Sequence, residues 1–533
     1  MKITRKIVYI SLFVFCLQMC FACMGCRVAK AEKSGEWEYR LKKNKTVEII
    51  KYRGTKKKVK IPSRIDGKRV TGIGKCAFQW RDEIKTIEIP KGVTDIKPRT
   101  FYGCRKLVDI TFPKGVKSIG KQAFYECASL TAIKIPEGVT DIGNGAFEKC
   151  SSLTSIKIPS NITGIGNDIF SECSSLADIE IPQDETGIGL IEARGTFFHC
   201  TSLKSINIPS NVTRIGSYAF CGCSSLTSIE IPTGVTSIGD AAFGECSSLT
   251  DLIIPSGVTE IGELAMAYCS SLASIKLPTG ITTIEFWTFV KCSSLTDVEI
   301  PSSVTTIGIG AFFDCDSLAT IKIPEGVTDI GEGAFDACIS LTDITIPYGV
   351  SRIKSDTFYC CTSLTSIKIP DSVTSIGNSA FGGCNSLTDI EIPDSVTDIG
   401  NGAFEDCRSL TSITIPQGEI GIGMDTFRGC SSLISVELPS SISYIGVFAF
   451  AGCSSLTTIE IPEEVDWIKY GAFHNCVNLE RITIRSLGMY VGDGAIDGIS
   501  EKAVIIVPEG RVGAYKKVFT NETGFKETMK IQS

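Results

Sequence analysis

Cysteine is the residue type in this chain whose number and spacing most strongly suggest a reactive or ligand-binding role. The sequence holds 24 cysteines and 2 histidines, and along most of its length one cysteine recurs every 23 residues, with a single gap of 27. A thiol can form a disulfide, bind a metal ion or act as a nucleophile. The members of this series, called here the cysteine ladder, are Cys104, Cys127, Cys150, Cys173, Cys200, Cys223, Cys246, Cys269, Cys292, Cys315, Cys338, Cys361, Cys384, Cys407, Cys430, Cys453 and Cys476.

The regular spacing argues against disulfides within the ladder. Consecutive ladder cysteines in stacked units lie ~4.8 Å apart, but their side chains point the same way, so their Cβ atoms stay beyond the preferred ~3.8 Å. Metal binding is poorly supported, because no C-x-x-C pair faces a second one and histidine is scarce. We therefore expect buried free thiols that behave as small hydrophobic groups. Cys360, next to Cys361, and Cys221, two residues before Cys223, are expected to be the more oxidisable thiols.

The rest of the sequence does not indicate catalysis. An active site needs unlike groups that converge on one point, whereas the repeats offer ladders of like groups. His199 and His474 are too far apart in a stack to share a Ser-His-Asp or Cys-His site. We expect no enzyme activity, no cofactor and no metal. The formal net charge of −6 also argues against a nucleic-acid partner.

The 23-residue spacing predicts the elements that position these side chains. Numbered from its cysteine, the unit 223–245 reads CSSLTSIEIPTGVTSIGDAAFGE, with apolar residues at positions 1, 4, 7, 9, 13, 16, 20 and 21. Positions 4–9 end in the period-2 alternation of a strand that the proline stops, and positions 13–16 form a second extended edge. One unit is too short to bury its own apolar face. Units must therefore stack into a repeat solenoid with one continuous core.

Two further positions of the unit carry expectations about packing and backbone. Phenylalanine at position 21 recurs from Phe78 to Phe473 and is expected to pack under the next strand. Glycine is common at position 17, but Lys97, Glu285 and Lys354 also stand there. A requirement for positive φ at position 17 is therefore not indicated.

The unit resembles that of the BspA-like leucine-rich repeats, which runs C-x-x-L-x-x-I-x-I-P-x-x-V-T-x-I-G-x-x-A-F-x-x. The likeness covers roughly residues 60–508, and nineteen units are in register when the end units are counted. It implies a curved leucine-rich-repeat stack with short parallel strands. The implied domains are an N-terminal cap over 32–80, repeats over 81–498, and a closing unit and tail over 499–533. The resemblance also implies a surface or secreted protein that binds other macromolecules.

Residues 1–31 are predicted to be a secretory signal peptide. Basic residues precede an apolar run over 7–22, and Ala29-Lys30-Ala31 offers small residues at the spacing that a signal peptidase reads. Two alternatives stay open: the apolar run is retained as a membrane anchor, or Cys23 or Cys26 is lipidated. The expected localisation is secreted or cell-surface.

Aromatic residues at normally polar positions form the candidate ligand-binding site. Interface energy concentrates in aromatic and arginine anchors, and most units carry Ser, Asp, Asn or Lys at positions 15, 18 and 19. Two adjacent units instead place Tyr444 and Trp467 at position 15, Phe448 at position 19 and Tyr470 at position 18. Stacking is expected to bring the four rings onto one flank. The alternative is that they serve packing between units or shield the core near its cap.

Weaker candidates lie elsewhere along the stack. Phe286 and Trp287 form a smaller aromatic pair, and the four-residue excess between Cys173 and Cys200 falls in the turn over 190–195. Positions 6 and 8 carry polar ladders in which Lys and Glu often fall on neighbouring strands. Such exposed pairs contribute only ~0.2–1 kcal/mol each. Ile253 is the one aliphatic exception at position 8.

These observations lead to one expected function and one alternative. We expect an adhesin-like, monomeric solenoid whose partner is an extracellular protein or glycan. The alternative is a structural spacer of the cell envelope without a specific ligand. The segment 32–60, rich in lysine and arginine, is expected to make at most a weak contact with anionic envelope polymers.

The signal-peptide assignment yields the first testable prediction. Exported protein is expected to begin at Glu32, because cleavage follows the small residues of Ala29-Lys30-Ala31. N-terminal sequencing of exported material checks this. An intact segment 7–22, or a diacylglyceryl cysteine, would contradict it.

Overall fold

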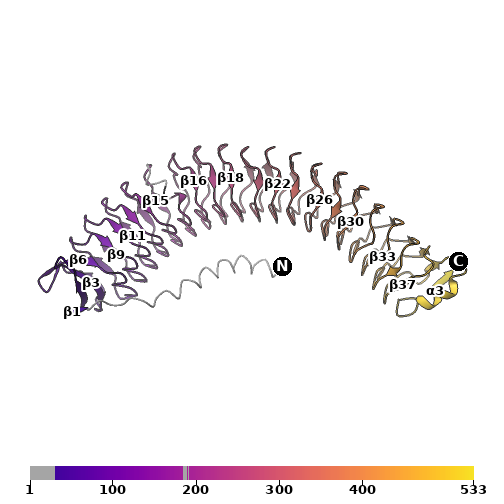
Figure 1. Ribbon diagram of the computed structural model, residues 1–533, viewed down its shortest axis with the longest axis horizontal. Coiled ribbons are helices and arrows are strands. Elements are labelled where there is room, and N and C mark those ends of the chain that lie inside the picture. Colours follow the sequence, from indigo (N-terminus) through magenta and orange to yellow (C-terminus); the bar gives the residue numbers. More distant parts are fainter. Residues whose placement is uncertain (1–30, 184–188, 190) are drawn as a thin grey trace.

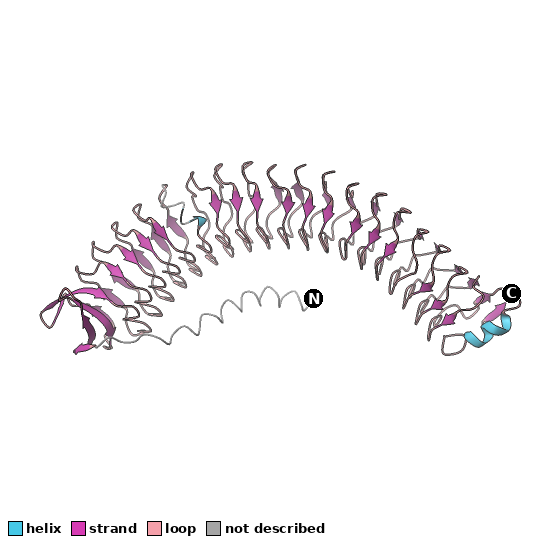
Figure 2. Cartoon of the chain, viewed as in Figure 1, coloured by secondary structure: helices cyan, strands magenta, loops and turns pink. Residues whose placement is uncertain are grey.

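The structure is a computed structural model that describes residues 31–183, 189 and 191–533. The repeats stack into one curved solenoid, with an N-terminal sheet at one end and helix α3 (Val512–Val518) at the other (Figure 1). The short strands repeat along the arc from coil to coil (Figure 2). The predicted leucine-rich-repeat stack with parallel strands is thereby confirmed. The predicted signal peptide lies, apart from Ala31, outside the described residues.

An antiparallel sheet closes the N-terminal end of the core. Strand β2 (Trp37–Leu41) pairs antiparallel with β1 (Glu32–Ser34) and with β3 (Val47–Tyr52), and β5 (Arg64–Ile65) pairs antiparallel with the start of β6 (Lys68–Ile73). Strand β3 then pairs in parallel with β6, which pairs in turn with the first repeat strand of the same sheet. The ring of Tyr52 is fully buried and stacks 5.4 Å from that of Phe78, the first phenylalanine of the repeat core.

The buried carboxylate of Glu48 ties this sheet to the first repeats. Its side chain accepts hydrogen bonds from Arg40 and from Lys97, which lies two coils further on. Burial opposes ionisation of Glu48, but these hydrogen bonds and charges outweigh it and lower the pKa. The sheet is therefore joined to the stack by ionic contacts as well as by apolar packing.

Strands at positions 6–9 of successive coils form what we call the first ribbon. Each strand pairs in parallel with the strand one coil away, as in Ser155↔Asp178. Its strands are β4 (Lys58–Lys60), β7 (Thr86–Glu88), β9 (Asp109–Thr111), β11 (Ala132–Lys134), β13 (Ser155–Lys157), β15 (Asp178–Glu180), β19 (Ser274–Lys276), β21 (Asp297–Glu299), β23 (Thr320–Ile321), β25 (Asp343–Ile344), β27 (Ser366–Lys368), β29 (Asp389–Glu391), β31 (Ser412–Thr414), β32 (Ser435–Glu437), β34 (Thr458–Ile461), β36 (Arg481–Ile484), β38 (Val504–Ile506) and β39 (Lys530–Gln532).

Strands at positions 15 and 16 form the second ribbon, which confirms the predicted second extended edge. Position 15 faces outward while the isoleucine at position 16 is buried, as in Asp329 and Ile330. Its strands are β6, β8 (Asp95–Ile96), β10 (Ser118–Ile119), β12 (Asp141–Ile142), β14 (Gly164–Ile165), β16 (Arg214–Ile215), β17 (Ser237–Ile238), β18 (Glu260–Ile261), β20 (Thr283–Ile284), β22 (Thr306–Ile307), β24 (Asp329–Ile330), β26 (Arg352–Ile353), β28 (Ser375–Ile376), β30 (Asp398–Ile399), β33 (Tyr444–Ile445), β35 (Trp467–Ile468) and β37 (Tyr490–Val491).

The coil between β30 and β33 carries Glu419 at position 13, a core position that most coils fill with Val or Ile. The Glu419 carboxylate is buried and accepts hydrogen bonds from the amides of Ile399 (2.7 Å), Ile420 (3.0 Å) and Gly421 (3.2 Å). Burial raises the pKa of Glu419, although the three amides oppose the rise. The carboxylate thus binds an amide of β30, while Ile422 of the same coil forms a parallel bridge with Ile445 on β33.

The core is a column of stacked phenylalanine rings at position 21. Neighbouring rings such as Phe312, Phe335 and Phe358 lie 5.5 and 5.7 Å apart, nearly parallel, and are fully buried. Met266 replaces one ring between Phe243 and Phe289 and is equally buried, because a flexible thioether fills the same space. The column confirms that phenylalanine at position 21 packs between coils.

Each coil also turns through two left-handed residues, at positions 19 and 23, which the sequence did not indicate. Large side chains occupy several of these sites, including Trp80 (φ 59°), Trp287 (φ 53°) and Phe448 (φ 53°). Position 17 is not left-handed, as expected. Its glycine serves close approach instead, since a Cβ on Gly143 would lie 2.6 Å from the backbone nitrogen of Lys121 in the preceding coil.

The column predicts that damage to the core stays local. Replacing Phe335 with Ala removes one ring between Phe312 and Phe358 and should cost about 3–5 kcal/mol in the flanking coils. Hydrogen exchange is expected to accelerate around Phe335 and to remain slow around Phe124, because each coil contacts only its neighbours. Tyr348→Ala, at a ring that is 68% exposed, is the matched control and should change neither region. Equal loss of protection along the whole chain would contradict the prediction.

Candidate functional site

The cysteine ladder is a structural feature of the core. The ladder thiols are free and buried, as expected. Each donates a hydrogen bond to a carbonyl oxygen of the coil before, as from Cys315 Sγ to Phe289 O and from Cys292 Sγ to Met266 O, both 3.2 Å. Burial raises the pKa of the Cys292 thiol to about 12. A thiol held protonated in this way is a poor nucleophile and a poor metal ligand.

The two thiols expected to be oxidisable differ from each other. Cys221 is only 6% exposed, because its sulfur packs against Gly244 of the next coil, and burial raises its pKa. Burial and the raised pKa contradict the expectation that Cys221 is one of the more oxidisable thiols. Cys360 is half-buried at a left-handed turn position and remains the more accessible of the two.

The two histidines lie in separate coils, each beside one carboxylate. His199 Nε2 is 3.9 Å from Glu245, and His474 Nδ1 is 3.7 Å from Asp497. Across residues 31–183, 189 and 191–533, no three side chains of His, Cys, Asp or Glu are grouped so that they could hold a metal ion.

The second ribbon carries three consecutive aromatic residues at position 15. Tyr444 on β33, Trp467 on β35 and Tyr490 on β37 are direct register partners, and we call them the aromatic ladder. Trp467 is 51% and Tyr490 79% exposed, while Tyr444 is half-buried. The ladder faces outward because position 15 alternates with a buried position 16.

A lysine and a glycine shape the aromatic ladder. Lys469 Nζ lies 4.2 Å from the ring centre of Tyr444 and 5.4 Å from that of Trp467, so one ammonium serves two rings. On the other side the Tyr444 ring lies over Gly421, where a Cβ would meet it at 2.3 Å. The aromatic ladder is therefore fixed at Tyr444 and open to solvent at Trp467 and Tyr490.

Phe448 and Tyr470 form a separate group at the turn that follows the second ribbon. Their rings meet edge to face at 5.1 Å, Arg428 lies over Phe448 at 5.8 Å, and His474 lies 6.3 Å from Phe448. Among the described residues, no ring contact links this pair to Tyr444 or Trp467. The four predicted site residues thus form two neighbouring groups, because positions 15 and 18–19 lie on either side of a bend in the coil.

Tyr490 is the member of the aromatic ladder that sequence reasoning missed. It stands at position 15 of the unit that begins at Cys476. The position numbering that identified Tyr444 and Trp467 could therefore have identified Tyr490 as well. The extension matters because Tyr490 is the most exposed ring of the three.

The smaller aromatic candidates make contacts with other residues of the chain. Phe286 and Trp287 stack on each other at 4.8 Å, and both are half-buried. In the four-residue excess, Leu190 lies outside the described residues, while Ile191 is fully buried. At the N-terminal end, Trp80 is 46% exposed but packs against Tyr102 at 5.1 Å, a contact that the sequence did not indicate.

The polar face of the first ribbon is lined by ion pairs across neighbouring strands, as expected. Lys276 Nζ lies 2.7 Å from Glu299 and Lys60 Nζ 2.9 Å from Glu88. Ile253 is 73% exposed on this face, which confirms the predicted aliphatic exception. These pairs make the ribbon wettable without contributing much stability.

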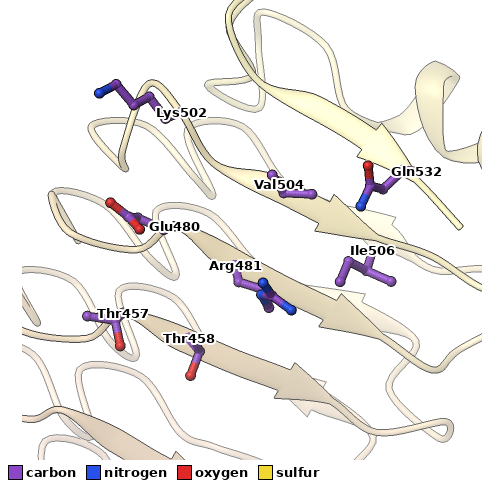
Figure 3. A pocket seen from close by; sticks show the side chains of 8 residues that line it. All are labelled: Thr457, Thr458, Glu480, Arg481, Lys502, Val504, Ile506 and Gln532. Carbon is purple, nitrogen blue, oxygen red and sulfur yellow. The ribbon is translucent and has the colours of Figure 1, made fainter.

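A hollow of about 440 Å³ lies at the C-terminal end of the first ribbon (Figure 3). Arg481 on β36 lies at its centre, with Thr458 on the strand before and Val504 on the strand after. The residues that line it are Thr457, Thr458, Glu480, Arg481, Lys502, Val504, Ile506 and Gln532.

Comparison with known proteins identifies the repeat and several similar structures. A family model described as "BspA type Leucine rich repeat region (6 copies)" matches residues 71–190, 193–319, 283–411 and 397–526. A leucine-rich repeat protein from Bacteroides ovatus is 28% identical, over 82% of this chain and 95% of that chain, with a TM-score of 0.44.

Two further solved structures are similar to the chain. A leucine rich cell surface protein from Faecalibacterium prausnitzii is 28% identical, over 80% of this chain and 94% of that chain, with a TM-score of 0.30. The pneumococcal vaccine antigen PcpA is 14% identical, over 95% of this chain and 99% of that chain, with a TM-score of 0.25. No curated protein matches the sequence at a significant level.

The burial of the thiols predicts their reactivity. In the native protein, iodoacetamide should label Cys360 and leave ladder cysteines such as Cys292 and Cys315 unlabelled, because these are buried and protonated. After denaturation without reductant, mass spectrometry should find the ladder fully alkylated. Abundant linked peptides, for example Cys292 to Cys315, would contradict the stacking geometry.

Proposed function

The chain belongs to the BspA-type leucine-rich-repeat family, and from this premise we propose that it is a secreted or cell-surface, adhesin-like protein that binds an extracellular protein or glycan. The observation that carries the proposal is the aromatic ladder, Tyr444, Trp467 and Tyr490, on three successive strands of the second ribbon. Exposed aromatic rings in adjacent register are the side chains that most often anchor a partner.

The surroundings of the aromatic ladder support a binding surface. Other coils place Asp329 or Ser375 at position 15, where they contribute little apolar area. Tyr444 is held in place by Lys469 and by the coil beneath it, so fixing it on binding entails little loss of conformational entropy. Trp467 and Tyr490 remain open for a partner.

The proposed location rests on the sequence and on a similar protein. Residues 1–31 have the pattern of a secretory signal, and the Faecalibacterium prausnitzii protein is a cell surface protein. In the part of the chain that the structure describes, no helix is both long and apolar enough to cross a membrane. Enzyme activity forms no part of the proposal, since the exposed groups in question are rings that bind rather than react.

A structural spacer is the alternative, and one observation favours it. Lys469 lies over both Tyr444 and Trp467, so part of the aromatic surface already has a partner within the chain. A spacer would use these rings to stiffen the last coils. Binding and folding measurements on the same variant distinguish the two functions.

The double variant Tyr444→Ser/Trp467→Ser tests the proposed function. Residues 32–533 are first applied to glycan and extracellular-matrix arrays, and the affinity for each partner found is then measured. The variant should fold normally, because other coils tolerate serine at position 15, as at Ser237. Binding should weaken by about 2 kcal/mol or more, as for an interface anchor.

Tyr348→Ser, which removes a lone exposed tyrosine, is the matched control and should bind at full strength. Tyr490→Ser alone should weaken binding as well, since its ring is the most exposed of the aromatic ladder. If the double variant instead loses hydrogen-exchange protection over the coils of 430–498, the rings are structural and the spacer is favoured. Full-strength binding by a folded double variant would place the site elsewhere.

A further inference from the structure

We propose that the hollow at the C-terminal end of the first ribbon is a second binding site, and that it takes a carboxylate-bearing glycan. This site does not depend on the aromatic ladder, although both lie on coils of the same C-terminal region. The argument rests on one arginine, on the charges around it and on the mixture of groups that line the hollow.

Arg481 differs in size and charge from the residues that other coils carry at position 6. The other ladder units put Ser, Thr, Asp or, once, Ala there, and Arg481 is the one arginine at positions 6 and 8 of these units. Its register partners are Thr458 on β34 and Val504 on β38, neither of which is acidic. A guanidinium offers a planar fork of donors that matches a carboxylate, so an unpaired arginine on a sheet face suits that group.

The charges at this end of the ribbon leave Arg481 available. Nearby cations are already neutralised, as in the pairs of Arg485 with Glu460 (2.8 Å) and Lys526 with Glu501 (3.0 Å). Within the described residues, Arg481, Lys502 and Lys530 have no ion pair. Lys530 shares the register of Arg481 two strands further on, so two cations without an ion pair lie in one register of the sheet, with Glu480 as the carboxylate of the hollow.

The other side chains of the hollow favour a sugar over an acidic peptide. The hydroxyl of Thr458, the amide of Gln532 and the carboxylate of Glu480 can exchange hydrogen bonds with sugar hydroxyls. Val504 and Ile506 are half-buried on the same face and offer an apolar surface to a sugar ring. A sugar chain supplies hydroxyl donors for the Glu480 carboxylate, whereas the side chains of an acidic peptide offer only further acceptors.

The dimensions of the site suit a polymer. Strands β34, β36, β38 and β39 are hydrogen-bonded neighbours, so Thr458 and Gln532 lie three strand spacings apart, roughly 14 Å. A chain lying across the strands would place one carboxylate at Arg481 and a second near Lys530. A uronic acid polymer provides this pattern of repeated carboxylates between hydroxyl groups.

Titration of residues 32–533 with polygalacturonate tests the proposal, with its methyl ester and poly-glutamate as comparison ligands. The ester keeps the sugar chain but removes the charge, and poly-glutamate keeps the charge without the sugar. Polygalacturonate is expected to bind, and both comparison ligands should bind at least tenfold more weakly. Tyr444→Ser/Trp467→Ser should retain polygalacturonate binding, which separates this site from the aromatic ladder.

The variants then locate the site. Arg481→Ala should weaken polygalacturonate binding at least tenfold, and Arg481→Lys should bind with intermediate affinity, because lysine keeps the charge but loses the fork. Arg352→Ala, at an exposed arginine of the second ribbon, changes the net charge equally and should bind as the unaltered protein does. No binding of polygalacturonate, equal binding of poly-glutamate, or equal losses in Arg481→Ala and Arg352→Ala would each overturn the proposal.

Discussion

Every coil of this protein can bury its apolar face only against the coils on either side. Its strands are two to four residues long in the repeats, too short to form a core alone. The phenylalanine column meets that constraint with nearly parallel rings whose centres lie 5.5 Å apart, as between Phe312 and Phe335. The cysteine ladder meets it with thiols that donate hydrogen bonds to carbonyl groups of the preceding coil. The two ends are closed differently: Glu48 of the N-terminal sheet accepts a hydrogen bond from Lys97 of the repeats, and Tyr515 of α3 is buried and donates a hydrogen bond to Ser486 O.

The same constraint decides how a binding site can arise. Equal positions in successive coils fall into register, so a change of residue type in two or three consecutive coils creates a continuous patch without any change of fold. The aromatic ladder arises in this way on the second ribbon, and the arginine hollow arises on the first ribbon of overlapping coils. Two ribbons of one short stretch can therefore carry patches of different chemistry, which mutation can separate.

Sequence periodicity predicted the features that repeat and missed those that depend on three-dimensional contacts. The alternation before each proline located the first ribbon, and Phe335 and its equivalents were expected to lie between coils. The left-handed turn residues were not predicted, because tryptophan at Trp80 and phenylalanine at Phe448 give no local sign of positive φ. The burial of Glu419 depends on an amide of the preceding coil, which no pattern within one unit reveals. Tyr444, Phe448, Trp467 and Tyr470 were expected to share one flank, but they form two groups, because of a bend that spacing alone does not show.

The central claim, that each coil is stabilised by its immediate neighbours in fixed register, is tested most directly by deleting one whole unit. A variant lacking residues 361–383 joins position 23 of one coil to position 1 of a later one, so the ladders of cysteine and phenylalanine realign. Hydrogen exchange measured over 312–360 and 384–430 should remain as slow as in the unaltered protein. Loss of protection on both sides of the deletion would contradict the account, because it would show that stability depends on the whole arc and not on neighbouring coils.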